Sequence, residues 1–123
     1  MKKLYFIVPL LVLLFAACSK RDYIPAQNNP RDWMRTHEEA IVAYVDYSTG
    51  NYVVETYQGF SVIELWEDIG PVEGDYEYAY FNNRGVQTIY NRSGDYFTKG
   101  RVVESYLSWS EAMYILDDLK YGY

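Results

Sequence analysis

The sequence predicts a mainly β protein: a small antiparallel curled sheet or partly open barrel of about five to six strands, with one C-terminal amphipathic helix. Between residues 39 and 106, aromatic and β-branched residues recur in short runs, which is typical of strands. Turn residues such as Gly, Asn and Ser separate these runs. Apolar residues follow helical spacing only after residue 108. A chain of 123 residues has room for one domain.

Residues 1–17 are predicted to be a signal peptide. A basic start is followed by an apolar run from residue 4 to residue 15, shorter than the ~20 residues that a membrane-spanning helix needs. The run ends in Phe15-Ala16-Ala17-Cys18, which resembles the lipobox of bacterial lipoproteins. In that family a signal peptidase cuts before the cysteine, so the resemblance implies that Cys18 carries the lipid. An uncleaved N-terminal anchor is the alternative interpretation.

The lipoprotein resemblance also implies a location in the bacterial cell envelope, with the domain outside the cytoplasm and the membrane as a partner through the acyl anchor. Ser19 follows the cysteine, and in the family's sorting scheme a residue other than Asp there implies the outer membrane. Display on the cell surface stays open, because the next residues are mostly basic. Cys18 is the only cysteine, so no disulfide can form within the chain.

Residues 18–36 are predicted to be the lipidated cysteine and a flexible tether, because they are rich in Pro, Asn and Gln. Within that stretch, Trp33 and Met34 could instead begin the domain as a short turn packed against the barrel end. Residues 37–123 are predicted to be a single β-rich domain. They carry five basic and fifteen acidic residues, a net charge of −10.

Six runs are predicted to be strands, and the short turns between them favour consecutive antiparallel pairing. They are residues 39–47, 51–57, 60–66, 76–81, 86–91 and 96–106. Residues 60–66 have large apolar side chains on both faces, which predicts a central strand covered on two sides. This strand is expected to form a hairpin with residues 76–81. Gly100 is a candidate for a bulge or sharp bend in the last strand.

A C-terminal helix is predicted from an N-terminal capping box, a stripe of apolar residues at helical spacing, and a glycine that can end it. Ser108 and Glu111 have the spacing of a capping box, and Gly122 is a suitable stop. Between them an apolar stripe is expected to cover the sheet or an open barrel end. The stripe consists of Ala112, Met113, Leu116 and Leu119.

Residues 39–106 resemble small OB-type bacterial domains. The resemblance lies in the strand-turn-strand opening, the Gly74-Asp75 pair after a long loop, and the strand Gly85-Val86-Gln87-Thr88-Ile89-Tyr90-Asn91. It implies a curled, partly open barrel. The chain departs from the common OB plan, because its only clear helix is C-terminal and not between the third and fourth strands. An open antiparallel sheet with the helix on one face is the alternative.

Few residues point to catalysis or to a metal. His37 is the only histidine and lies at the end of the tether, so a catalytic triad or a zinc site is not expected. Six carboxylates surround one loop but lack the spacing of a calcium loop, which favours a solvated acidic loop, with weak cation binding as the alternative. They are Glu64, Glu67, Asp68, Glu73, Asp75 and Glu77. We therefore expect no metal, no cofactor and no enzymatic activity, with a carboxylate-dependent hydrolase as a distant alternative.

The tyrosines are the most unusual feature, fifteen in all. Tyr76, Tyr78 and Tyr80 alternate onto one face of a strand and, with Trp66, form the candidate binding surface for a protein, peptide or glycan. Alternatively, they simply cover a sheet face, because Tyr is a good strand residue. Nucleic acid is not expected as a partner, because the domain is strongly acidic. The favoured function is thus a lipid-anchored, non-enzymatic binding module, and the alternative is a purely structural envelope lipoprotein.

Overall fold

A computed structural model of the chain describes residues 29–122. The predicted signal peptide, Cys18 and most of the predicted tether lie outside this range. Across the described residues, no helix has the length and apolar character needed to cross a membrane.

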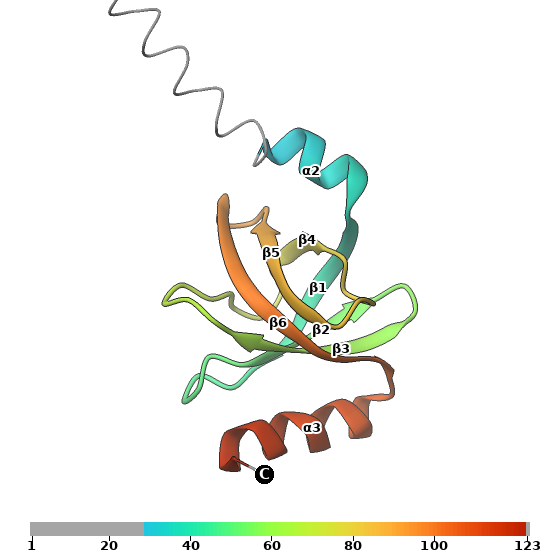
Figure 1. The fold of residues 1–123 in the computed structure, drawn as a ribbon, viewed down its shortest axis with the longest axis vertical. Helices are drawn as coiled ribbons and strands as arrows, with labels where there is room; N and C mark the ends of the chain where they lie inside the picture. The colour runs from blue at the N-terminus through green and yellow to red at the C-terminus, as the bar shows by residue number, and fades with distance from the viewer. Residues whose placement is uncertain (1–28, 123) are drawn as a thin grey trace, which may run out of the picture.

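Within residues 29–122, six antiparallel strands form a closed barrel flanked by two helices (Figure 1). The elements are α2 (Pro30–Thr36), β1 (Glu38–Val45), β2 (Tyr52–Thr56), β3 (Gly59–Leu65), β4 (Tyr76–Ala79), β5 (Gly85–Asn91), β6 (Tyr96–Leu107) and α3 (Trp109–Tyr121). The prediction of a mainly β fold with a C-terminal helix is confirmed. The barrel is closed where a partly open one was expected. It also differs from the OB plan in having six strands and no helix between β3 and β4.

The strand order is β1-β2-β3-β6-β5-β4, and β4 pairs back with β1. Strands are consecutive within each half of the barrel, but β3 pairs with β6 and not with β4. The predicted consecutive pairing is therefore wrong at this point, as is the hairpin between residues 60–66 and 76–81. The loop after β3 instead delivers β4 to the free edge of β1, so that every strand has two neighbours.

Strand β3 is covered on both faces, as predicted. Ile63 points into the barrel, where it belongs to the main apolar core. Val62 points outward into a second cluster, together with Ala112 and Leu116 of α3. The helix therefore packs on the outer face of the barrel, across β2, β3 and β6, and does not cover an open barrel end.

Helix α3 forms as the sequence predicts. The Ser108 side chain accepts from the Glu111 backbone N–H, the Glu111 carboxylate accepts from the Ser108 N–H, and Gly122 adopts the left-handed conformation. These contacts satisfy backbone groups that an isolated helix end would leave unpaired.

Gly100 is neither a bulge nor a break, because β6 runs through it in regular register with Leu65 and Gln87. A Cβ at this position would lie 2.8 Å from Ile63 Cγ2. The glycine is thus required by close packing inside the barrel. The irregular register lies further along β6, between Val102 and Leu107, where Tyr106 has a positive φ of 58°.

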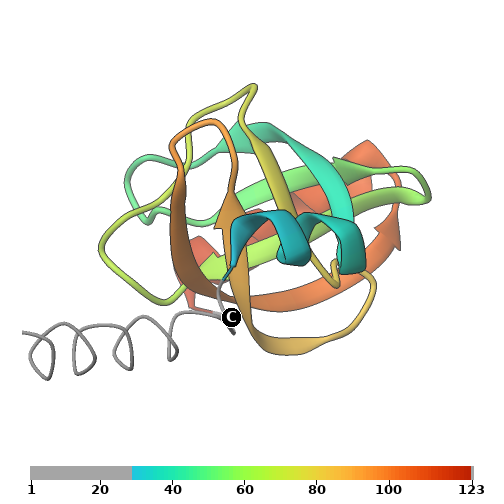
Figure 2. The same ribbon diagram turned by 90° about the horizontal axis from the view of Figure 1, so that it is seen from above.

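Residues 30–36, which were predicted to belong to the tether, form helix α2. The Asn29 side chain caps it by accepting from the backbone N–H groups of Arg31 and Asp32. Trp33 then fixes the helix to the barrel, because its Nε1 donates to the Tyr78 carbonyl at 2.8 Å. Figure 2 shows α2 lying across the barrel end that faces away from α3. The expected contact between Trp33 and the barrel end is present.

Candidate functional site

The tyrosines of the predicted binding surface do not form one exposed platform. Tyr78 is only 8% exposed, and its hydroxyl donates to the Glu39 carboxylate on β1. Tyr80 is 47% exposed and follows β4, with its ring 4.2 Å from the His37 ring. Tyr76 lies beneath the guanidinium of Arg92 at 4.7 Å. Each ring therefore has a different environment.

Trp66, the fourth predicted residue, lies elsewhere. It follows β3, which is separated from β4 by two strands in either direction around the barrel. Trp66 is 55% exposed, and its Nε1 donates to the Glu64 carboxylate at 2.9 Å. That carboxylate also accepts from Arg101 Nε at 2.8 Å. The closed barrel thus does not bring Trp66 together with the β4 tyrosines.

The carboxylates around the acidic loop also separate. Glu73 accepts from the Val45 N–H and the Tyr47 hydroxyl at the surface, whereas Asp75 and Glu77 converge on the side-chain amide of Asn91. In the range 29–122, no cluster of three or more His, Cys, Asp or Glu residues has metal-binding geometry.

Glu77 is the most perturbed carboxyl. It is completely buried inside the barrel, accepts from the Tyr52 hydroxyl at 2.8 Å, and lies 3.3 Å from Asn91 Nδ2. Burial raises its pKa to about 7, and the nearby negative charge of Asp75 adds to the rise. A raised carboxyl pKa is a feature of many catalytic sites, but a substrate could reach this group only if the barrel opened. The network is therefore best explained as a polar part of the interior.

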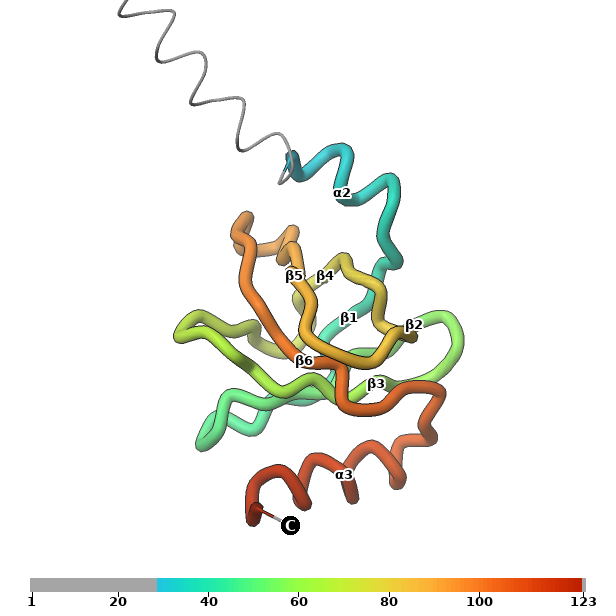
Figure 3. The backbone as a smooth tube through the Cα atoms, in the orientation of Figure 1, coloured from blue at the N-terminus to red at the C-terminus, as the bar shows by residue number. Residues whose placement is uncertain are grey.

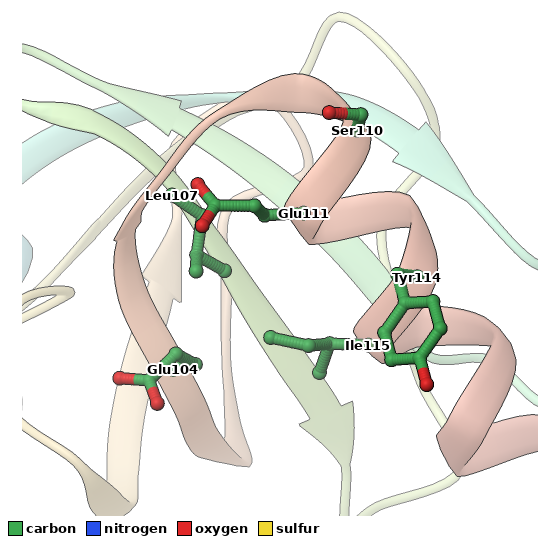
Figure 4. Close-up of a pocket in the computed structure, with 6 residues that line it drawn as sticks. All are labelled: Glu104, Leu107, Ser110, Glu111, Tyr114 and Ile115. Atoms are coloured by element: carbon green, nitrogen blue, oxygen red, sulfur yellow. The ribbon is translucent and has the colours of Figure 1, made fainter.

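An open groove lies between the end of β6 and the first turns of α3 (Figure 4). Its volume is about 530 Å³, and it is lined by Glu104, Leu107, Ser110, Glu111, Tyr114 and Ile115. We call it the β6–α3 groove. Leu107 and Ile115 contribute apolar surface and pack against the outer cluster beneath α3. Tyr114 is 69% exposed, so much of its ring is free to contact a partner.

The groove forms because β6 is longer than its neighbour β5. The first residue of β5, Gly85, pairs with Val102, and residues 103–107 pair only with β3. The capping box at Ser108 then starts α3 directly, and the chain folds back beneath the barrel (Figure 3). The outer side of the β6 end and one side of α3 are thus left facing each other.

Two carboxylates give the groove a negative rim. Glu104 is held by Arg84, whose Nε and Nη2 lie 3.0 and 2.6 Å from Oε1. These hydrogen bonds lower the Glu104 pKa. The Ser108 N–H donates to Glu111 at 2.9 Å and lowers the pKa of that carboxyl. Both groups are therefore ionised at neutral pH.

The β6–α3 groove was not predicted from the sequence, although one signal for it was present. Tyr114 lies off the buried stripe of α3, on a side of the helix that also carries charged residues. Trp109, at the helix start, is also partly exposed, with its ring edge-on to Phe60 at 5.2 Å. An exposed aromatic that lies beside an apolar groove is a candidate for binding, because it extends the apolar surface there.

No known protein family matches the chain, and no curated protein or solved structure matches it significantly.

Proposed function

We propose that the chain is a lipid-anchored, non-enzymatic module of the bacterial cell envelope that binds a protein or peptide in the β6–α3 groove. The observation that carries the proposal is the groove itself, an apolar floor with an exposed tyrosine beside an otherwise closed barrel. Concave apolar surfaces with a few fixed polar groups are the usual form of binding sites.

The groove chemistry favours a peptide over a glycan. Sugar hydroxyls need many polar partners, whereas the exposed lining of the groove is mostly apolar. The apolar side chains Leu107 and Ile115 match aliphatic or aromatic side chains of a peptide instead.

The position of α2 fits an anchored module. Helix α2 is the first described element and lies on the side of the barrel opposite α3 (Figure 1). A lipid anchor at Cys18 would therefore hold the protein from the α2 side. The groove would then face away from the membrane, toward partners in the surrounding compartment.

Site-specific photo-cross-linking in the source envelope tests the proposal. A photoreactive residue replaces Tyr114 in the full chain, and the matched control replaces Val72, which is similarly exposed in the loop between β3 and β4. We expect a discrete protein adduct from position 114 and none from position 72. A third variant carries the probe at Tyr80. Adducts from Tyr80 alone would favour the surface that the sequence predicted and would overturn the groove.

A further inference from the structure

The end of β6 is an open strand edge beside the β6–α3 groove. On one side, residues 103–107 pair with β3, from Val62↔Glu104 to Phe60↔Leu107. On the other side, β5 stops at the Gly85↔Val102 pair, and no backbone hydrogen bond from another described segment reaches residues 103–107. Elsewhere the barrel covers such an edge: the Val42 N–H beyond the β1–β4 pairing donates to the Asp75 carbonyl, and Gly74 N–H donates to the Val42 carbonyl.

We propose that the partner binds as an extended, basic peptide that adds a strand to residues 103–107 of β6 and places alternate side chains in the β6–α3 groove. This inference rests on the proposed function and names its ligand class. In strand addition, main-chain hydrogen bonds provide affinity. Pockets beside the strand edge bind every second side chain of the peptide and so provide specificity. The groove lies beside this edge, because Glu104 and Leu107 line it from β6.

Charge decides which peptide fits. Glu104 and Glu111 border the groove, and the next turns of α3 add Asp117 and Asp118. Among the residues that line the groove, none is basic. On the same elements and beside them, Arg84 and Arg101 are already bound to Glu104 and Glu64. Lys99 lies near the start of β6, before residues 103–107, and Lys120 lies near the helix end. Every second side chain of an added strand points toward the groove. A peptide with apolar residues and Lys or Arg at these positions would bury the first in the groove and place the second at the acidic rim.

The backbone conformation of Tyr106 supports a binding role for residues 103–107 of β6. Its φ of 58° is uncommon for a bulky aromatic residue, and its side chain is exposed. The irregular register there turns the β6 end relative to β3. Bulges are frequent where a strand must re-aim its side chains next to a binding site.

The test starts from a random twelve-residue peptide library displayed on phage and selected against the full chain in detergent. We expect the selected peptides to carry apolar and basic residues at every second position, on one face of the strand. Synthetic copies are then N-methylated at every second residue, in either of the two registers. Because alternate amides of an added strand point toward its neighbour, one register should lose at least tenfold in affinity and the other less than twofold. Binding should also slow amide hydrogen exchange within residues 103–107.

The outcomes separate the two proposals. Equal loss from both methylation registers, or exchange protection confined to other segments, would overturn strand addition while leaving a peptide-binding module in place. Selection of no peptide at all would overturn the peptide partner and this inference with it. Tyr114→Ala should weaken the selected peptides at least fivefold, and Val72→Ala, a similarly exposed site outside the groove, should leave them unchanged. Equal affinity for both variants would remove the groove from the interface.

Discussion

The hydroxyl of Tyr52 donates a 2.8 Å hydrogen bond to the carboxyl of Glu77, and both side chains are completely buried inside the barrel. The strands that carry them, β2 and β4, are not paired and are separated by β1. The bond thus crosses the barrel interior and ties its two halves together. Buried polar groups are stabilising only when they are satisfied by hydrogen bonds. The Asn91 side-chain amide extends this pair to the half-buried carboxylate of Asp75.

Stability should fall as the pH rises through neutrality. The pKa of Glu77 is about 7 in the folded protein, against an ordinary value of 4.5. The folded state therefore keeps a proton that the unfolded chain loses, and the associated stability is complete below pH 4.5 and is lost as the pH approaches and passes 7. The loss should be ~3 kcal/mol between about pH 4.5 and 8. Urea unfolding at a series of pH values measures it.

Glu77→Gln is the control for this titration. The variant keeps the size of the side chain but cannot ionise, so the fall in stability across this pH range should largely disappear. A wild-type profile that rises or stays flat between pH 5 and 8 would contradict the assignment of Glu77 as a buried protonated acid.

Tyr78→Ala should destabilise the domain by ~3–5 kcal/mol, as is typical when a buried aromatic is truncated. Tyr78 is buried and bonded to Glu39, and the backbone of the same residue holds Trp33. Tyr80→Ala, at an exposed ring two residues away, should cost about 1 kcal/mol or less. Equal, small losses in denaturant midpoint for both variants would show that Tyr78 is not a packing residue.

Leu116→Ala should cost ~2–5 kcal/mol, because Leu116 is buried between α3 and the outer face of the barrel. Asp117→Ala, the adjacent exposed position on the helix, should change stability by less than ~0.5 kcal/mol. Denaturant unfolding compares the two. If Leu116→Ala were as mild as its neighbour, α3 would not be packed on β3.

Cys18→Ser should abolish metabolic labelling with palmitate and leave an uncleaved precursor, since the lipobox resemblance places the lipid on this residue. Ser19→Ala, one residue further, keeps the cysteine and should retain the label. Labelling that persists in the Cys18 variant would remove the lipoprotein assignment and, with it, the orientation proposed for the groove.

The sequence by itself determined the elements whose contacts are local. Helix α3 follows from Ser108, Glu111 and Gly122, because capping interactions join residues only three or four positions apart. The strands are also predicted by their runs of β-branched and aromatic residues. The burial of β3 on two sides follows from the apolar residues on both of its faces. Helix α2 was not predicted. It has only seven residues, about two turns, and although Asn29 caps it locally, its place on the barrel depends on Trp33 reaching a carbonyl 45 residues away.

Only the tertiary structure decided which strands meet and which faces turn inward. Alternation places Tyr78 and Glu77 on opposite sides of β4, but nothing in that pattern says that Glu77 enters the barrel while Tyr78 packs outside it. The face of β4 that points inward is decided when the barrel closes, because β4 then pairs with β1 and not with β3. Inside the closed barrel, Tyr52 and Asn91 become the hydrogen-bond partners of the Glu77 carboxyl. The same closure leaves β6 longer than β5 and so creates the β6–α3 groove. Pairing between distant strands is chosen by the free energy of the whole barrel, which no short stretch of sequence encodes.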